Sequence, residues 1–375
     1  MTPADLSPVV VRAVRCAVED GELPAGAVVP ERVVVERSRP GGVGDYASPV
    51  AFRVGKDAGV APRDVAEILA GRLGRVPGIE RVEITGAGFL NFVLVESPVA
   101  ELVRGVRARG ARYGFAPDAE LDGLGGRVVG EAVLPLDGEL RERVVRGAVL
   151  RILHSQGHGA EQGHGDGHRP AGVAPVARRD GDVVAVYGGD AAAWAMLGVP
   201  AHETPVFPAW LPVQDESSEF FRVRYAYSRA CALGRNAEQL GFRGEAGDLG
   251  EAGDLGEAAH LGEAGAFSES SADPREATAP GTPAPAPATP LLRALADYPL
   301  VLEAAAHHRA PERLVRHLVV LADALLDFQY TVPVLPKGDE KPSAAHRARL
   351  ALAEAAGTVL AGGLALLGID APDRL

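Results

Sequence analysis

The sequence PERLVRHLVVLADALLDFQYTVPV, residues 311–334, decides the fold of the C-terminal part of this chain. Its apolar residues alternate spacings of four and three, which places them on one stripe of a helix. The stripe consists of Leu314, Leu318, Leu321, Leu325 and Phe328. Pro311 can open this helix because its missing N–H falls in the unpaired first turn, and Pro333 ends it. The stretch therefore predicts a long amphipathic helix that buries one face.

A second helix of the same kind follows in SAAHRARLALAEAAGTVLAGGLALLG, residues 343–368. Ser343 is a suitable N-cap, and Gly368 supplies the left-handed residue that commonly ends a helix. Its apolar stripe consists of Leu350, Ala353, Val359, Leu360, Leu364 and Leu367. A shorter helix is expected near residues 299–308. Periodicity alone thus predicts an all-α helical bundle over residues 291–375.

Particular residues of this bundle carry a resemblance. FQYT at 328–331, LALAEA at 350–355 and LLGIDAPDRL at 366–375 resemble, in order, the DALR anticodon-binding domain of arginyl-tRNA synthetases. The resemblance implies that Tyr330, the C-terminal Leu375 and the stem residue Tyr225 lie close to a tRNA anticodon. The family usually ends in Met, and it carries a Cys downstream of the tyrosine where this chain has Val332 and Pro333.

Three arginines are candidates for phosphate contacts near the implied anticodon site: Arg229, Arg313 and Arg316. The alternative is that they lie on solvated helix faces, which is the ordinary state of arginine.

Residues 1–118 predict a small α/β domain. Helices are expected at 9–17, 49–58, 62–73 and 99–110, and strands at 32–36, 79–84 and 89–94. Within it, GDYA at 44–47 and GAGFLNF at 86–92 resemble the N-terminal additional domain of the same synthetases, which reads the tRNA D-loop. The matching residues are Phe89, which could stack on an unpaired base, and Asn91, which could hydrogen-bond its edge. Alternatively, Phe89 and Phe92 face a core and Asn91 faces solvent.

The middle region, residues 124–240, resembles only the edges of a class I catalytic domain and stem, so it is expected to be a degenerate α/β remnant. RVVGEAV at 127–133 could be its first strand. At the ATP signature Pro-x-x-His-Ile-Gly-His, Leu136 and Glu139 replace the two histidines and Gly138 alone is retained. A carboxylate at that place would repel a phosphate. The second, lysine-containing ATP loop is also excluded, because the lysines are Lys56, Lys337 and Lys341.

Two further stretches have simple compositions. A Gly-rich stretch carries four histidines whose spacing is a weak signal for Zn²⁺ or Ni²⁺, against the alternative of a polar loop. These are His154, His158, His164 and His168. Acidic hexapeptide copies begin at Glu245 and run into a Pro-Ala run, so residues 241–290 predict a disordered linker.

Composition bounds the remaining choices. The net charge is −12, but residues 236–289 hold ten acidic residues and two arginines, so the balance neither supports nor excludes RNA binding. Two cysteines fit a reducing compartment, and neither a secretory signal nor an apolar run long enough to span a bilayer is evident. A cytoplasmic protein without membrane contact is expected.

The sequence therefore predicts an α+β protein: a small N-terminal α/β domain, a remnant α/β middle region and a C-terminal all-α bundle. The resemblance implies a tRNA-binding protein without a working aminoacylation core, with arginine tRNA as partner and no cofactor. One alternative is an arginine–tRNA ligase, which would require ATP and arginine. The other is a protein-interaction module that has lost RNA binding, and the sequence identifies no protein partner.

Overall fold

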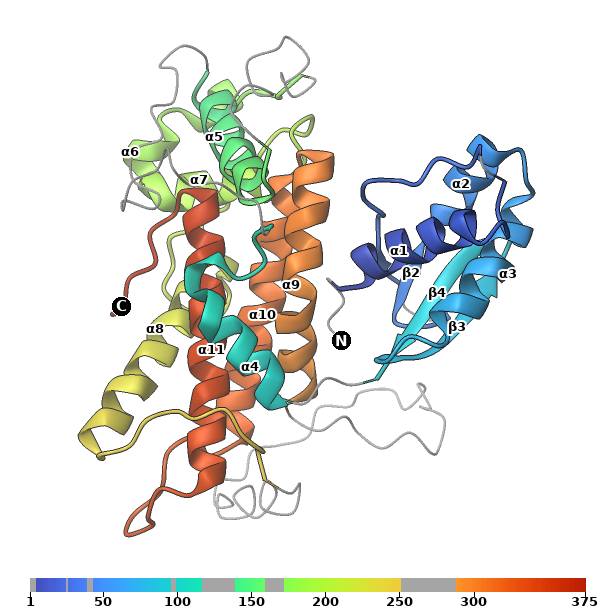
Figure 1. Cartoon of the computed structure of the whole chain (residues 1–375). Coiled ribbons are helices and arrows are strands. Elements are labelled where there is room, and N and C mark those ends of the chain that lie inside the picture. The colour runs from blue at the N-terminus through green and yellow to red at the C-terminus, as the bar shows by residue number, and fades with distance from the viewer. Residues whose placement is uncertain are drawn as a thin grey trace, which may run out of the picture.

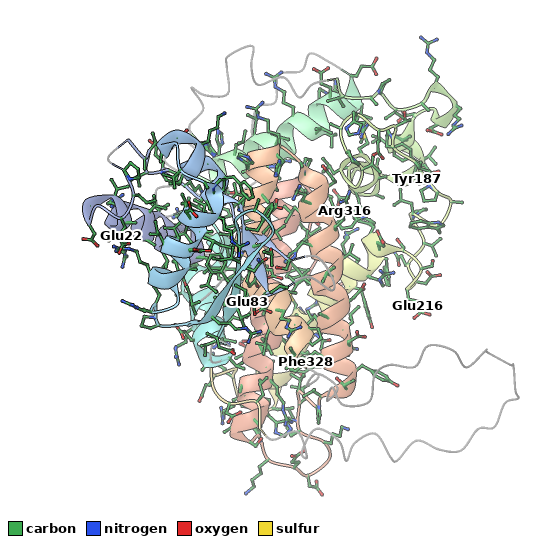
Figure 2. The ribbon with its side chains drawn as sticks, turned by 90° about the vertical axis from the view of Figure 1, so that its right-hand side faces the viewer. Glu22, Glu83, Tyr187, Glu216, Arg316 and Phe328 are labelled. Carbon is green, nitrogen blue, oxygen red and sulfur yellow. The ribbon has the colours of Figure 1, made fainter. Side chains whose placement is uncertain are left out.

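The computed structural model describes residues 5–24, 26–38, 43–95, 99–116, 139–158, 172–250 and 288–375. Within these residues the chain forms a small N-terminal domain with a sheet and a larger bundle of helices beside it (Figures 1 and 2). The predicted α+β class is confirmed. The expected strand at 127–133 lies outside the described residues, and the described part of the middle region is helical.

The N-terminal domain packs three helices against an antiparallel sheet with strand order β1-β2-β4-β3. Its elements are α1 (Leu6–Glu19), β1 (Glu36–Arg37), β2 (Tyr46–Ser48), α2 (Val50–Ala58), α3 (Pro62–Leu73), β3 (Ile79–Thr85) and β4 (Phe89–Leu94). In the register, Ile84 pairs with Leu90, and Tyr46 pairs with Phe92. The predicted strands at 79–84 and 89–94 are confirmed.

The strand predicted at 32–36 joins the sheet only through Glu36. The preceding backbone is paired with side chains instead of a neighbouring strand. The Val33 N–H donates to Ser7 Oγ at 3.1 Å, and the Ser48 hydroxyl donates to the Val34 carbonyl at 2.9 Å. These bonds satisfy buried polar groups without a ladder, so β-branched residues alone did not decide the strand.

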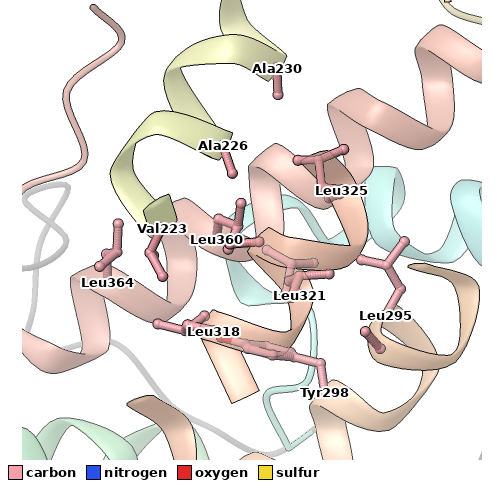
Figure 3. Packing of buried hydrophobic residues seen from close by; sticks show 14 of the residues in the cluster. Val223, Ala226, Ala230, Leu295, Tyr298, Leu318, Leu321, Leu325, Leu360 and Leu364 are labelled. Carbon is pink, nitrogen blue, oxygen red and sulfur yellow. The ribbon is translucent and has the colours of Figure 1, made fainter. Parts of the chain in front are cut away.

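The bundle has one continuous core. Its helices are α4 (Val99–Arg109), α5 (Leu140–Ser155), α6 (Val183–Tyr187), α7 (Gly189–Leu197), α8 (Glu219–Gln239), α9 (Thr289–His308), α10 (Pro311–Thr331) and α11 (Ala344–Leu367). The predicted stripe of α10 is buried and meets α8, α9 and α11, where Leu318, Leu321 and Leu360 lie together (Figure 3). The bounds predicted for α10 and α11 are confirmed, including the Ser343 cap and the left-handed Gly368 at φ 77°.

Two glycines of α11 allow its neighbours to approach closely. A Cβ placed on Gly363 would lie 2.5 Å from Leu318 of α10, and one on Gly357 would lie 2.9 Å from Ala230 of α8. Both distances are far below van der Waals contact between carbons. The small residues of α11 therefore set the spacing of the three central helices.

Helix α9 begins at Thr289 and continues through Pro299, although the sequence predicted a shorter helix that starts at the proline. A proline inside a helix leaves the carbonyl four residues earlier without its N–H partner. That carbonyl belongs to Leu295, and it accepts the Tyr113 hydroxyl at 3.2 Å. The ring of Tyr113 also stacks on Tyr298, with centroids 6.1 Å apart. A tertiary hydrogen bond thus replaces the missing helical one.

Two predicted boundaries differ from the structure. The N-terminal domain was predicted to reach residue 118, but Leu102, Val103 and Val106 of α4 are buried in the bundle core, so its described part ends near residue 95. The predicted linker 241–290 is ordered at both described ends. Residues 288–290 lead into α9, and residues 241–250 pack on α11. Residues 251–287 lie outside the described part.

The ordered segment 241–250 is held by a buried guanidinium. Arg349 of α11 is 2% exposed and donates to the carbonyls of Leu249 at 3.0 Å and Pro333 at 3.2 Å. Leu249 is itself buried in the bundle core, and the Glu245 N–H donates to the Arg347 carbonyl at 3.0 Å. The sequence predicted a disordered linker here, but the first acidic hexapeptide copy buries Leu249 in the bundle core.

The N-terminal domain contacts the bundle through α9. Leu300 of α9 is buried in the core of the N-terminal domain. The Tyr46 hydroxyl donates to the carboxylate of Asp297, and Arg32 Nε lies 2.7 Å from Glu303 Oε1. These contacts place the edge of the small sheet beside the hairpin of α9 and α10 (Figure 1).

Helix α11 is, among the described helices, long and apolar enough to cross a membrane by length and composition. The sequence had been expected to hold no such run. In the structure, 78% of its most apolar window is buried inside the protein. Core packing accounts for its apolar composition.

Candidate nucleic-acid interface

The most exposed aromatic side chain of the bundle is Tyr330, in the last turn of α10. It is 93% exposed. Phe328, two positions earlier, is completely buried. Two helical residues rotate a side chain by roughly 200°, so burial of Phe328 directs Tyr330 to the opposite face. The Thr331 hydroxyl donates to the Asp327 carbonyl at 2.8 Å, and the helix ends at this residue, directly after the tyrosine.

Helix α8 carries an aromatic and cationic row beside this end of α10. Phe221 and Tyr225 are stacked with centroids 5.4 Å apart, and the Arg229 guanidinium lies 5.9 Å from the Tyr225 ring. Arg229 Nε also donates to Gln329 Oε1 at 3.4 Å, next to Tyr330 in the chain. Arg222 is paired with Asp323 at 2.8 Å, which fixes α8 against α10. The contact of Arg229 with Gln329 therefore places the Tyr225–Arg229 pair against the last turn of α10, which carries Tyr330.

The C-terminal residues lie along a neighbouring face of α8. The Asp373 carbonyl accepts hydrogen bonds from the Ser228 hydroxyl at 3.3 Å and from Arg235 at 3.2 Å. Leu375 is 52% exposed. The predicted residues at this end thus flank α8, with Tyr330 on the side of α10 and Leu375 on the side of the chain terminus.

Arg313 and Arg316 lie elsewhere, and their predicted place near the anticodon site is wrong. They are in the first turns of α10, whereas Tyr330 is in its last. A helix rises roughly 1.5 Å per residue, so Arg316 and Tyr330 are about 20 Å apart along the axis. Arg313 lies 3.9 Å from Glu36 of the N-terminal domain, and Arg316 is exposed. Both belong to the groove between the two domains.

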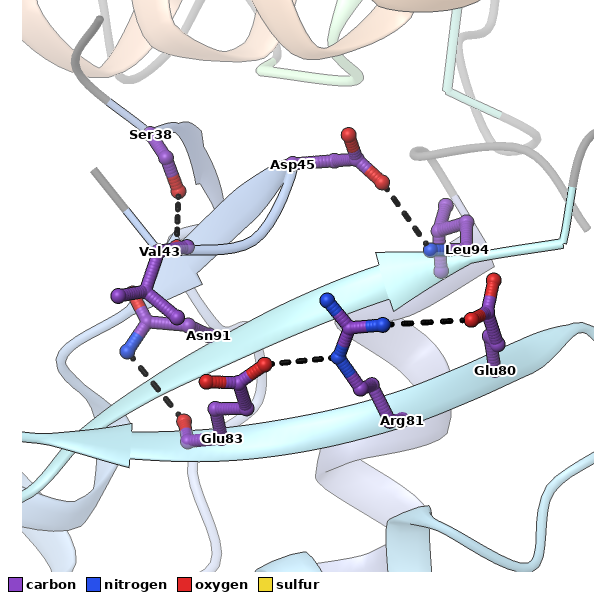
Figure 4. Close-up of polar contacts among 8 residues, drawn as sticks. All are labelled: Ser38, Val43, Asp45, Glu80, Arg81, Glu83, Asn91 and Leu94. Carbon is purple, nitrogen blue, oxygen red and sulfur yellow. Dashed lines mark hydrogen bonds and ion pairs between the residues drawn. The ribbon is translucent and has the colours of Figure 1, made fainter. Parts of the chain in front are cut away.

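In the N-terminal domain, the two predicted base-contacting residues differ in exposure. Phe89 is 44% exposed and makes an edge contact with Phe52, with centroids 4.9 Å apart. Asn91 is only 5% exposed, and its amide donates to Thr85 Oγ1 at 2.8 Å and to the Phe89 carbonyl at 3.3 Å. The same amide donates to the Glu83 carbonyl at 3.3 Å, as Figure 4 shows. Phe89 remains available for stacking. The Asn91 donors instead stabilise the β3–β4 hairpin, so the structure gives no support to its predicted contact with a base edge.

The degenerate ATP signature is described only in part. Glu139 is the extended residue before α5, and Leu136 and Gly138 lie outside the described residues. Next to it, Arg141 is completely buried and donates to backbone carbonyls of Ala174, Pro200 and Glu203. Burial lowers the pKa of Arg141. Through these hydrogen bonds the guanidinium holds the segment after residue 172 against the first turn of α5.

The candidate metal site receives no support. His164 and His168 lie outside the described residues. His154 is in the last turn of α5, and His158 lines a different hollow, between the N-terminal domain and α9. Among the described side chains, His, Cys, Asp and Glu nowhere gather in a group of three that could hold a metal ion.

Comparison with known protein families shows that both domains match domains of the same synthetase family. Residues 10–94 match the arginyl tRNA synthetase N terminal domain, and residues 267–375 match the DALR anticodon binding domain. The chain belongs to the arginyl-tRNA synthetase family. The arginine–tRNA ligase of Frankia alni is 50% identical over 116 residues, which cover 31% of this chain and 21% of the ligase. The ligase of Micrococcus luteus is 37% identical over 167 residues, which cover 42% of this chain and 29% of the ligase.

This synthetase-family chain therefore spans less than a third of the length of the curated relatives it matches. Among solved structures, arginyl-tRNA synthetase from Thermus thermophilus aligns with a TM-score of 0.49 and 15% identity, covering 100% of each chain.

Sequence reasoning missed two members of the surface on α8 and α10. Phe221 supports the Tyr225 ring, and Gln329 accepts from Arg229. The signal for Phe221 was present, since Phe221, Tyr225 and Arg229 follow one another at intervals of four on one helical face. Gln329 could not be found in this way, because its contact joins two helices that are distant in sequence.

Proposed function

We propose that this synthetase-family chain binds tRNA, in particular arginine tRNA, and does not itself activate arginine. The observation that carries the proposal is Tyr330, fully presented to solvent at the end of α10 beside the Tyr225–Arg229 pair, within the domain that matches an anticodon-binding family. An exposed aromatic next to a guanidinium suits an unpaired anticodon base, which can stack on the ring while the cation contacts phosphate.

The N-terminal domain supplies the second contact of the proposal. Phe89 presents a half-exposed ring at the start of β4, held in place by its edge contact with Phe52. Such a ring could stack on a base of the D-loop. Asn91 takes no part in this contact, and its effect on binding is indirect, through the shape of the hairpin that carries Phe89.

The absence of arginine activation is proposed on three grounds. Leu136 and Glu139 stand at the positions of the ATP-signature histidines, and no lysine is present between Lys56 and Lys337. In the described residues between the two matched domains, the chain forms helices and no strands. The first turn of α5 is covered by the segment that Arg141 holds. We expect that ATP and arginine are therefore not ligands of this chain.

The binding test is a titration of the full chain with arginine tRNA at several salt concentrations. Tyr330→Ala should weaken binding about tenfold at fixed salt, because a lost base–aromatic stack typically costs on the order of 1–3 kcal/mol. Tyr330→Phe keeps the ring and should bind within about threefold of wild type. Equal affinity of wild type and Tyr330→Ala would overturn the proposed anticodon contact, and absence of any tRNA affinity would favour a protein-interaction module.

The test of catalysis is arginine-dependent ATP–pyrophosphate exchange with purified protein, in the presence and absence of tRNA. We expect no exchange above that of heat-inactivated protein. Exchange that depends on arginine would contradict this part of the proposal and establish a ligase instead.

A further inference from the structure

A groove runs between the N-terminal domain and the hairpin of α9 and α10. It has a volume of about 650 Å³. Its walls include apolar side chains of both domains, such as Val35 and Val301, and its charged residues include three arginines of the bundle. These are Arg293, Arg313 and Arg316. The groove exists because the N-terminal domain meets the bundle directly through α9, so it is a feature of this arrangement of domains.

A second hollow continues from the first at Arg316, which lines both. It has a volume of about 430 Å³ and lies between α10, the end of α7 and the segment around Trp210. Figure 2 shows Arg316 on α10 with the N-terminal domain on one side and the region of Tyr187 on the other. The two hollows therefore lie next to each other with Arg316 at their shared edge, and together they are called the track.

The charges along this track favour an anionic ligand. Arg293 and Arg316 are both exposed, and neither makes an ion pair with any residue that the structure describes. The carboxylates of the first hollow are engaged at the domain contact, since Glu36 lies 3.9 Å from Arg313 and Asp297 accepts from Tyr46. The second hollow contains one acid, Glu219, among its lining residues.

The second hollow also presents an aromatic ring. Trp210 is 45% exposed, whereas the next residue, Leu211, is buried and its carbonyl accepts the Ser218 hydroxyl at 3.1 Å. The Val213 N–H donates to the Trp210 carbonyl at 3.0 Å. The backbone on both sides of the tryptophan is thus fixed while its ring faces solvent. Arginines that follow a groove to an exposed aromatic platform are the combination that binds single-stranded nucleic acid.

We propose that this track binds a single-stranded segment of RNA, with phosphates on Arg293 and Arg316 and one base stacked on Trp210. The inference rests on the proposed RNA-binding function and adds a third contact to those of Tyr330 and Phe89. Helices α9 and α10 are antiparallel neighbours, so Arg293 and Arg316 are about 15 Å apart at a rise of roughly 1.5 Å per residue. This distance corresponds to on the order of four phosphates in a stacked strand.

Tryptophan fluorescence tests the stacking directly. The chain has two tryptophans, and Trp194 is only 4% exposed. Adding a short single-stranded oligoadenylate to the full chain should quench the fluorescence of Trp210. Trp210→Phe should abolish the quenching and keep most of the affinity, whereas Trp210→Ala should weaken binding about tenfold. Thermal melting of both variants checks that the fold is intact.

Salt titration tests the arginines. Arg293→Ala and Arg316→Ala should each lower the salt slope of oligoadenylate binding by about one, while Arg316→Lys keeps the charge and the slope. Arg104→Ala is the matched control, because Arg104 is exposed on α4 and lines neither hollow. Arg104→Ala should leave the slope unchanged.

The possible results separate this inference from the proposed function. If tRNA binding depends on Tyr330 but oligoadenylate neither quenches Trp210 nor responds to Arg293→Ala and Arg316→Ala, the track is not an RNA site and the anticodon contact stands. If RNA binding is absent altogether, both fail. If duplex RNA quenches Trp210 as well as the single strand does, the stacking on Trp210 is wrong.

Discussion

The hydroxyl of Tyr113 should stabilise the bundle because it replaces a hydrogen bond that Pro299 removes from α9. Tyr113→Phe deletes this hydroxyl and keeps the ring that stacks on Tyr298. The Leu295 carbonyl would then have neither a helical N–H donor nor the hydroxyl. An unsatisfied buried acceptor costs about 1–3 kcal/mol, so we expect the free energy of unfolding to fall by about 1–2 kcal/mol.

The reasoning can be isolated by a double-mutant cycle with Pro299→Ala. An alanine at this position restores the backbone N–H that can donate to the Leu295 carbonyl within the helix. In that background Tyr113→Phe should lower the free energy of unfolding by less than about 0.5 kcal/mol, which gives a coupling energy on the order of 1 kcal/mol. Urea denaturation followed by circular dichroism measures all four proteins. An equal loss in both backgrounds would refute the account, because the hydroxyl would then act independently of the proline.

Three further predictions follow from burial and charge. Asn91→Ala should destabilise the N-terminal domain by about 1–3 kcal/mol in urea denaturation, because it removes buried amide donors. Phe89→Ala should lower the free energy of unfolding by about 1 kcal/mol and weaken tRNA binding about tenfold in a titration. Leu249→Ala should lower the free energy of unfolding by about 2 kcal/mol, and the exposed Leu240→Ala should not change it; no loss for Leu249→Ala would mean that residues 241–250 do not pack on α11. Burial raises the pKa of Glu303 despite the neighbouring guanidinium, so its contribution to stability is complete below the unfolded pKa of about 4.3 and is lost as pH rises through the folded pKa. Urea denaturation should therefore show that wild type loses more stability between pH about 4 and 7 than Glu303→Gln does. Equal losses in the two proteins would contradict the burial of this carboxyl.

Much of the fold was accessible from local patterns. The bounds of α10 and α11 follow from proline and glycine signals and from apolar spacing that any helix must obey. The exposure of Tyr330 follows from the same geometry, because a residue two positions after a buried Phe328 faces away from the core. Phe89 and Tyr330 were singled out from the sequence by their match to synthetase motifs, and the structure shows that both rings are exposed.

Hydrogen-bond partners of polar side chains were not accessible in this way. The position of Asn91 on β4 was predicted, but its donors are taken by Thr85, Glu83 and Phe89 across a hairpin. The continuation of α9 through Pro299 depends on a hydroxyl from residue 113, far away in the sequence. Local propensity correctly marks proline as a helix breaker, and a distant donor overrides it.

The sequence by itself determined α10, α11, β3 and β4, the apolar faces of the two helices and the family that the chain resembles, because these properties depend on neighbours within a few residues along the chain. The tertiary structure alone decided that Arg313 and Arg316 line a groove with the N-terminal domain and that Arg316 meets the hollow of Trp210. The physical reason is that helix geometry fixes only the position of a residue along and around its own helix. The surface to which the residue belongs depends on the elements that pack against that turn of the helix.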